Sequence, residues 1–519
     1  MVGDKERKRD TMFINRYTSN PRFLLVYSPL QFAPNEMAKP DGSLGLLYLA
    51  GALRQAGFEV KILDISVGNE KDDLKDTFFN PKPLKSGLLR VGMSHKRVLE
   101  EVRDYDVIGI SSIFTPQTSM VIETIKLIKQ EYPNKLVISG GVNARHSCEK
   151  FFNAGVDIIC LSEAEETIVN IGNLLRQNTR DFRTLPGIAY RVGNKVIYNP
   201  QQRIIANLDF LPLPAWDLLP NDKYWQISRP HGGEFPIDKS IKYASIMTSR
   251  GCVFSCAYCH ISKEKEQSSP DGGIGKLRTK SIERVLLEIN MLKSLGVEYI
   301  FIEDDSLLAK KQRTIKIFRS LRDKKLNLAD VNGVNIIHFF KNVNGRLVID
   351  KELLESLVEV GFETMILPFE TANQRILDKY ASRKWKVNKV DTIALIKACT
   401  DVGLKVSGNY MIGFPDETFD EISNTISFAR SHIEAGLTYA NFFCPIPYPG
   451  STLYDIAIRE GYLSPDFNPD DMKWTKSAMQ NTVINNDELT EIRRNAWLTV
   501  NRPEYIKYKI GMNATQSLP

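Results

Sequence analysis

Three cysteines stand close together near the middle of the chain, Cys252, Cys256 and Cys259, with the spacing C-x3-C-x2-C. Three thiolates on one short loop can hold three irons of a 4Fe–4S cluster and leave the fourth iron without a protein ligand. An iron left open binds and reduces a small molecule more readily than a fully ligated electron-transfer cluster does. The spacing therefore predicts an iron–sulfur site with one open position.

Zinc is the main alternative for this motif, because soft thiolates also suit zinc. A structural zinc site usually combines two Cys or His pairs that are well separated in sequence, and here only His260 is adjacent. A third interpretation, three unrelated buried thiols, conflicts with their density. The other cysteines are scattered, and we expect them to be reduced thiols: Cys148, Cys160, Cys399 and Cys444.

The cysteine loop directly follows the first of six candidate strands, which alternate with helical patterns. The clearest helix begins after Ser281 as N-cap and carries one apolar stripe up to Leu295. Such alternation predicts a parallel sheet, and six β/α units are two short of a full eight-stranded barrel. The candidate strands are Tyr243–Thr248, Glu298–Ile302, Val334–Phe340, Thr364–Phe369, Leu404–Met411 and Tyr439–Cys444.

The chain divides into five parts on these patterns. Residues 21–175 also alternate strand and helix, which predicts a doubly wound (Rossmann-like) α/β domain with ligands at the carboxyl ends of its strands. Residues 176–235 are rich in breakers and are predicted to be a linker, and 1–20 a mobile tail. Residues 236–454 form the predicted partial (β/α)6 barrel, and 455–519 a small helical C-terminal region.

The overall composition is that of an ordinary globular protein. Of the 519 residues, 43% are hydrophobic and 25% charged, which excludes a disordered or fibrous chain. The net charge of +6 is mild for this length and gives no reason to expect a nucleic-acid partner. No apolar signal region follows the charged N-terminus, and no apolar stretch reaches 18 residues. We therefore expect a cytoplasmic protein without a membrane partner.

Residues 236–450 resemble the radical S-adenosylmethionine (SAM) superfamily. The resemblance rests on the three-cysteine loop and on four further segments, each of which follows a candidate strand. It implies that SAM binds the open iron of a 4Fe–4S cluster held by the three cysteines. One electron then cleaves SAM to methionine and a 5′-deoxyadenosyl radical. The four segments are Ile302–Asp305, Pro368–Thr371, Met411–Glu417 and Pro445–Tyr454.

The same resemblance implies residues that hold SAM. Glu303, Asp304 or Glu370 would anchor its ammonium group or ribose by charge-assisted hydrogen bonds. Asn409 would bind ribose hydroxyls, and Tyr258 would pack near the adenine. The plainer alternatives are that an acidic residue at a strand end caps the next helix, and that a loop tyrosine only packs.

The region before the barrel resembles the cobalamin-binding domain of cobalamin-dependent radical SAM enzymes. Segments Asp41–Ala50 and Gly57–Asp64 match the first helix and second strand of that domain. The chain lacks the Asp-x-His-x-x-Gly signature, so we predict no histidine ligand to cobalt. A domain that keeps the fold without the cofactor is the alternative. The implied cobalamin contacts are Ser111, Ser112, Ser139, Gly140 and Gly141.

Together, the two resemblances imply a cobalamin-dependent radical SAM methyltransferase. It would methylate an unactivated carbon, or phosphorus, of a small metabolite through methylcobalamin, with an external electron donor such as flavodoxin or ferredoxin. The alternatives are a radical SAM oxidative cyclase or rearrangement enzyme, a tRNA methylthiotransferase, and a non-catalytic cobalamin sensor. A methylthiotransferase would need three further cysteines in the N-terminal domain, where only Cys148 and Cys160 lie. No residue is predicted to act directly in catalysis.

Overall fold

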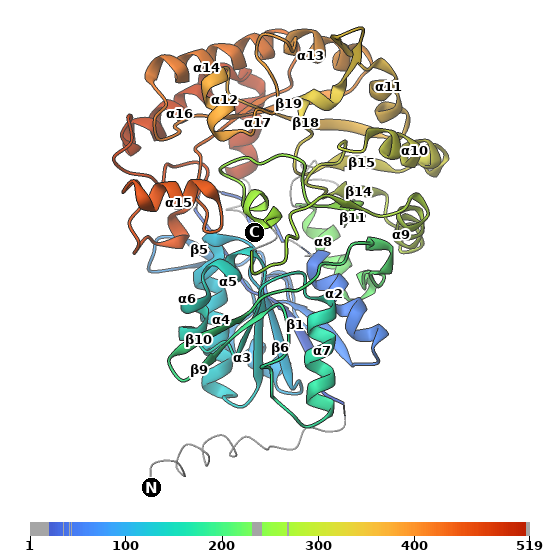
Figure 1. The fold of residues 1–519 in the computed structure, drawn as a ribbon, viewed down its shortest axis with the longest axis vertical. Coiled ribbons are helices and arrows are strands. Elements are labelled where there is room, and N and C mark those ends of the chain that lie inside the picture. Colours follow the sequence, from blue (N-terminus) through green and yellow to red (C-terminus); the bar gives the residue numbers. More distant parts are fainter. Residues whose placement is uncertain are drawn as a thin grey trace.

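The computed structural model describes residues 20–34, 36–40, 42, 44–230, 241–266 and 269–514. The chain folds into two lobes, the first coloured blue to green and the second yellow to red (Figure 1). The predicted tail lies outside the described residues except for Asn20. Within the described ranges, no helix is long and apolar enough to cross a membrane.

A seven-stranded sheet forms the centre of the first lobe, in the order β10-β9-β8-β7-β6-β1-β3. The strands from β3 to β8 in this order are parallel to one another. They are almost wholly apolar and buried, as expected for strands covered by helices on both faces. These strands are β1 (Phe23–Tyr27), β3 (Val60–Asp64), β6 (Val107–Ser111), β7 (Leu136–Gly140) and β8 (Ile158–Cys160).

Helices cover both faces of this sheet, which confirms the doubly wound fold. Helices α2 and α7 contribute to one hydrophobic cluster, and α3, α4 and α6 to another on the opposite face. A small sheet of β2 (Leu30–Phe32), β5 (Leu89–Val91) and β4 (Lys82–Pro83) lies beside them. The helices are α2 (Leu44–Gln55), α3 (His95–Val102), α4 (Thr118–Glu131), α5 (Val142–His146), α6 (Cys148–Ala154) and α7 (Glu165–Arg176).

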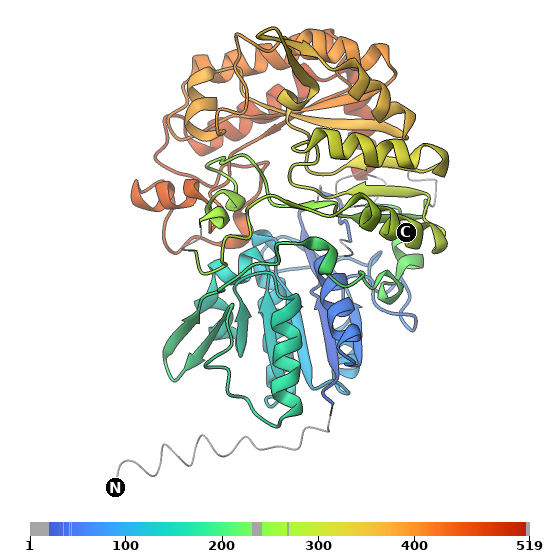
Figure 2. The same ribbon diagram turned by 45° about the vertical axis from the view of Figure 1, so that its right-hand side comes forward.

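The predicted linker 176–235 is not a simple connection. It contains β9 (Ile188–Val192) and β10 (Lys195–Asn199), which pair antiparallel and extend the first sheet at its edge (Figure 2). Gly193, with a φ of 58°, provides the tight turn between them, and the proline-rich breakers come only later. The chain then crosses to the second lobe through α8 (Asn221–Ile227), and the linker's last five residues lie outside the described part.

Six parallel strands form the second lobe in the order β11-β14-β15-β18-β19-β20, which confirms an open partial barrel. The strands are β11 (Tyr243–Ile246), β14 (Tyr299–Ile302), β15 (Asn327–Asp330), β18 (Phe362–Glu370), β19 (Lys405–Met411) and β20 (Ala440–Phe443). The helices outside them are α9 (Ile282–Ser294), α10 (Lys311–Leu321), α11 (Lys351–Glu359), α12 (Gln374–Tyr380), α13 (Thr392–Asp401) and α14 (Phe419–Glu434). Two further two-stranded antiparallel sheets are β12 (Ser249–Arg250) with β13 (Arg278–Thr279) and the hairpin β16 (Phe340–Val343) with β17 (Arg346–Ile349).

The third barrel strand differs from the prediction of Val334–Phe340. The strand is β15, which ends at Asp330, and most of the predicted segment is a short 3₁₀ helix, η6 (Ile336–Phe339). Most of its apolar side chains are buried, so the apolar pattern predicted burial correctly. The backbone, however, is a 3₁₀ helix and not an extended strand. The chain turns away from the sheet after Asp330, whose carboxylate accepts a hydrogen bond from the backbone N of Gly333 at 2.7 Å.

The C-terminal region consists of α15 (Thr452–Arg459), η7 (Pro469–Asp471), α16 (Asn486–Val500) and α17 (Pro503–Ala514). Helix α16 packs beside β20, the outer strand of the barrel. The side chain of Asn501, just after α16, accepts from the backbone N of Ala440 at 2.7 Å and donates to its carbonyl oxygen at 2.8 Å. This amide therefore occupies the place that a neighbouring strand would have.

Candidate functional site

Two cavities adjoin at the carboxyl ends of the strands. One of about 830 Å³ lies inside the barrel, and one of about 460 Å³ lies between the two lobes. Sites of α/β folds gather at these strand ends, so both cavities are where ligands are expected. The two cavities share a wall, formed by His260, Ile261, Asp305, Val331 and Asn332.

The three clustered cysteines all line the barrel cavity, on the loop that follows β12. Gly251 starts this loop with a φ of 82°, and a Cβ there would lie 2.5 Å from the carbonyl oxygen of Lys276. Burial raises the pKa of the Cys256 and Cys259 thiols, so their thiolate forms need a cationic partner at neutral pH. Three soft donors on one short loop that need positive charge fit an iron–sulfur cluster.

Tyr258 and Glu370 meet inside the barrel cavity. The Tyr258 hydroxyl donates to Glu370 Oε1 at 2.7 Å, and Lys384 Nζ donates to the same oxygen at 2.7 Å. Burial lowers the pKa of Lys384, but the Glu370 carboxylate outweighs this and raises that pKa above its ordinary value. Glu370 has a φ of 64°, a conformation that costs a non-glycine residue about 1–3 kcal/mol and is often found at functional sites.

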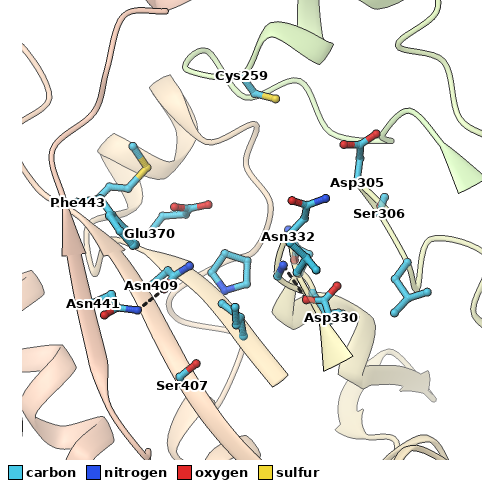
Figure 3. A pocket seen from close by; sticks show the side chains of 18 of the residues that line it. Cys259, Asp305, Ser306, Asp330, Asn332, Glu370, Ser407, Asn409, Asn441 and Phe443 are labelled. Atoms are coloured by element: carbon cyan, nitrogen blue, oxygen red, sulfur yellow. Dashed lines mark hydrogen bonds between the residues drawn. The ribbon is translucent and has the colours of Figure 1, made fainter. Parts of the chain in front are cut away.

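Asn409 lies on the same side of the cavity, on β19. Its side-chain oxygen accepts from Asn441 Nδ2 at 3.3 Å. Figure 3 shows Glu370 and Asn409 on one side of the space and Asp330 on the other. Three predicted SAM residues, Tyr258, Glu370 and Asn409, are thus brought together around one cavity.

The acidic segment after β14 is arranged differently from the prediction. Asp304 is fully buried outside both cavities, where it accepts hydrogen bonds from the backbone N and hydroxyl of Thr248 and from the Ser249 hydroxyl. Its carboxylate therefore holds the start of β12 to the end of β14, and it lines neither cavity. Glu303 lines only the cavity between the lobes. The residue of this segment that reaches the barrel cavity is Asp305, which was not among the predicted site residues. Burial raises the pKa of Asp305 to about 6.

The cavity between the lobes is lined by Ser111, Ser139, Gly140 and Gly141 from the ends of β6 and β7. A Cβ at Gly141 would lie 2.4 Å from the carbonyl oxygen of Ser112, and its φ is 100°. Glycine at this position therefore lets the loop after β7 lie directly against the loop after β6. Of the predicted cobalamin contacts, Ser112 alone does not line the cavity.

Ser112 supports the cavity wall from behind. Its hydroxyl accepts from Asn143 Nδ2 at 2.8 Å, and its carbonyl oxygen accepts from the backbone N of Asn143 at 3.2 Å. These bonds fix the β6 loop against α5, which follows Gly141. The turn at Ser111–Ser112 and the pair Gly140–Gly141 therefore form one rigid wall of the cavity.

A group of buried charges joins the lobes beside this cavity. Arg250 of the barrel contacts Glu165 at 2.6 Å and Glu163 at 3.2 Å, and Arg278 donates to both oxygens of Glu163. Burial raises the pKa of Glu163, but the two arginines outweigh it and hold that pKa below its ordinary value. Sequence reasoning missed these pairs, which are 85 or more residues apart and leave no local signal.

Comparison with known families matches both lobes. Residues 246–429 match the radical SAM superfamily, and residues 42–172 match the B12 binding domain. The chain is therefore a radical SAM enzyme that carries a cobalamin-binding domain. Its cofactors are accordingly a 4Fe–4S cluster, SAM and cobalamin.

Similar proteins indicate that this radical SAM enzyme is related to cobalamin-dependent methyltransferases. Cytidylyl-2-hydroxyethylphosphonate methyltransferase of Streptomyces wedmorensis is 27% identical over 456 residues, which cover 82% of this chain and 79% of the relative. An uncharacterised methyltransferase of Pyrococcus horikoshii is 27% identical over 491 residues, 92% of each chain.

Solved structures share the two-lobe fold. The cobalamin-dependent SAM radical enzyme OxsB covers 96% of this chain and 71% of its own, with a TM-score of 0.68 and 15% identity. The radical SAM methyltransferase TsrM of Kitasatospora setae covers 87% of this chain and 82% of its own, with a TM-score of 0.62 and 15% identity. At this identity, the likeness concerns the fold alone.

Proposed function

We propose that this chain is a cobalamin-dependent radical SAM methyltransferase that methylates an unactivated carbon, or phosphorus, of a small metabolite. The observation that carries the proposal is the shared wall of the two cavities, where Asp305 and Asn332 line both. A methyl transfer of this kind needs SAM and cobalamin on two sides of one substrate. The chemistry supplied by the bound cofactors is a 5′-deoxyadenosyl radical from SAM and a methyl group from cobalamin.

The chain's own residues divide into two sets under this proposal. Cys252, Cys256 and Cys259 hold the cluster and leave one iron position free for SAM. On the barrel side, Glu370 accepts hydrogen bonds from SAM donors while Lys384 balances its charge, and Asn409 offers its amide to the ribose.

Under the same proposal, cobalamin binds in the cavity between the lobes. Its site is lined by Ser111, Ser139, Gly140 and Gly141, and glycine at 141 lets the two loops of this wall pack closely together. The buried charges at Arg250 and Glu165 keep the lobes closed on one another, which excludes water from the space between the cofactors. A small electron-transfer protein such as flavodoxin or ferredoxin would supply the electron.

The test is anaerobic reconstitution of the whole chain with iron, sulfide, cobalamin and SAM, followed by addition of a chemical reductant. We expect 5′-deoxyadenosine and, with substrate, a product that is heavier by one methyl group. A product without added methyl would support the cyclase or rearrangement alternative. No 5′-deoxyadenosine from a preparation with full cluster content would contradict the proposal.

A further inference from the structure

The wall of the barrel cavity built by β15 and η6 carries three polar side chains, each with a buried polar atom, that have no place in the assignments above. Asp330, Asn335 and His338 all line this cavity. Within the described part of the chain, Asp330 Oδ1, Asn335 Nδ2 and His338 Nε2 are buried and lack a hydrogen-bond partner. Buried polar atoms are rarely left without partners, so three on one wall point to a ligand.

Two of these side chains are already fixed by their other polar atom. Asp330 Oδ2 accepts from the backbone N of Gly333 at 2.7 Å, and Asn335 Oδ1 accepts from the backbone N of Ile337 at 3.1 Å. Asp330 is 3% exposed and Asn335 is 7% exposed. Each side chain therefore holds its second atom in one orientation before a ligand arrives, which lowers the entropy lost on binding.

The wall stands where a substrate has to lie. It faces the proposed SAM residues Glu370 and Asn409 across the cavity (Figure 3). Val331 and Asn332, which directly follow Asp330, line both cavities. A molecule held on this wall is therefore placed between the SAM side and the cobalamin side.

We propose that Asp330 and Asn335 bind a hydroxyl group of the substrate, which makes the substrate a hydroxyalkyl compound at the end that enters the barrel. The proposal rests on the proposed function and names the substrate class for it. A hydroxyl accepts from Asn335 Nδ2 and exchanges a second hydrogen bond with Asp330 Oδ1. An apolar chain leaves both atoms unpaired.

The charge of this wall supports a neutral partner. Burial raises the pKa of Asp330 to about 8, and burial lowers the pKa of His338 to about 4. Both groups are thus mainly uncharged at neutral pH. A neutral wall offers neither an ion pair to an ammonium group nor a cation to a phosphate, whereas it suits a hydroxyl.

Binding of two matched probes tests the proposal. Cytidylyl-2-hydroxyethylphosphonate carries the hydroxyalkyl group, and cytidylyl-ethylphosphonate lacks only the hydroxyl. Calorimetry is done anaerobically on the full chain loaded with cluster, cobalamin and SAM, without reductant, so that no turnover occurs. We expect the hydroxyl probe to bind at least about tenfold more tightly, because the deoxy probe leaves two buried groups unpaired.

Variants at these two residues locate this preference. Asn335→Ser keeps an oxygen that accepts from the backbone N of Ile337 but has no donor at the place of Nδ2, and Asp330→Val loses the carboxyl, so each should reduce the preference below about threefold. Asp330→Asn keeps a neutral polar atom at the same place and should retain most of it. Asp401→Asn, an exposed carboxylate on α13, is the matched control and should leave the preference unchanged.

Three results would overturn the proposal: equal binding of the two probes, no measurable binding of the hydroxyl probe, or an unchanged preference in Asn335→Ser. If Asp330→Val does not fold, Asn335→Ser alone decides, because its loop hydrogen bond is kept. The proposed function is read separately, from 5′-deoxyadenosine formed by the same wild-type preparation after reductant is added. Failure there leaves the binding result standing.

Discussion

Arg250 of the barrel and Glu165 of the cobalamin-binding lobe form a buried ion pair of 2.6 Å on the wall of the cavity between the lobes. Their side chains are 13% and 6% exposed. Arg250 immediately precedes Gly251, at the start of the cysteine loop. The pair therefore connects the position of the cysteine loop directly to that of the cavity between the lobes.

Replacing Arg250 with Met should destabilise the contact between the lobes. It leaves Glu165 buried without its arginine partner, while Glu163 keeps Arg278, and this costs about 3–5 kcal/mol. Thermal unfolding and limited proteolysis should both show the loss, and the double variant Arg250→Met/Glu165→Gln should recover part of it. Arg54→Met breaks an exposed pair with Asp217 and should cost less than about 1 kcal/mol. Equal losses for both arginines would argue against this account.

Adding one methyl group at Gly141 should distort the proposed cobalamin site. Gly141→Ala places a Cβ 2.4 Å from a backbone oxygen, so the wall has to shift. Gly193→Ala is the matched control, because Gly193 also has positive φ but nothing within 4 Å of its Cβ position. Both variants bear a backbone cost of about 1–2 kcal/mol. Only Gly141→Ala should weaken cobalamin binding by tenfold or more in a spectroscopic titration.

Loss of one clustered thiol should abolish the cluster. Cys256→Ala removes a proposed iron ligand, so visible absorbance, iron and sulfide content and 5′-deoxyadenosine formation should all fall to background. Cys399→Ala removes a fully buried thiol in the core behind the barrel and should keep all four signals. A cluster of normal content in Cys256→Ala would mean that the ligands are assigned wrongly.

Removing the charge of Lys384 should affect both stability and SAM binding. In Lys384→Met the Glu370 carboxylate, 6% exposed, loses its cation, at a cost of about 3–5 kcal/mol. The double variant Lys384→Met/Glu370→Gln should regain stability because no buried charge remains, but it should still bind SAM weakly. Denaturant titration and SAM binding by equilibrium dialysis measure the two effects. Full recovery of SAM binding in the double variant would exclude Glu370 from the SAM site.

The pH dependence of the protein's stability should reveal the raised pKa of Asp330. Burial raises its pKa to about 8, so between about pH 4 and pH 8 the folded chain keeps a proton that the unfolded chain loses. Stability therefore falls as pH rises through this window. Asp330→Asn removes this term, so its stability relative to wild type should improve from pH 5 to pH 8, by at most about 1.4 kcal/mol per pH unit. Parallel stability curves would contradict the assignment.

The sequence predicted those site residues that lie at or near the carboxyl end of a strand within a recognisable motif. The cysteine loop, Glu370, Asn409 and the Gly140–Gly141 pair are of this kind, and all line one of the two cavities. Their roles in binding stay predictions. Their placement was accessible because the carboxyl ends of parallel strands meet at one edge of a sheet.

What the sequence left out depends on geometry beyond the local pattern. Among the consecutive carboxylates after β14, only the turn of the backbone decides that Asp305 enters the barrel cavity while Asp304 is buried elsewhere. The apolar run after Asp330 predicts burial, but short buried runs occur both in strands and in 3₁₀ helices, so the pattern does not distinguish the two. The pairing of Arg278 with Glu163 joins residues 115 positions apart, which no local signal reveals.

The amide of Asn501 bears on how the protein behaves in concentrated solution. An open barrel ends in a strand whose backbone groups can recruit a strand from another molecule, which is a common beginning of aggregation. Asn501 occupies this edge at Ala440, and Arg493 donates to the carbonyl oxygen of Phe442 two residues further on. Side chains from α16 and the residue just after it thus cover the edge at which a seventh strand would pair. The barrel stays open to its ligands, while its outer strand is protected at these positions from pairing with another molecule.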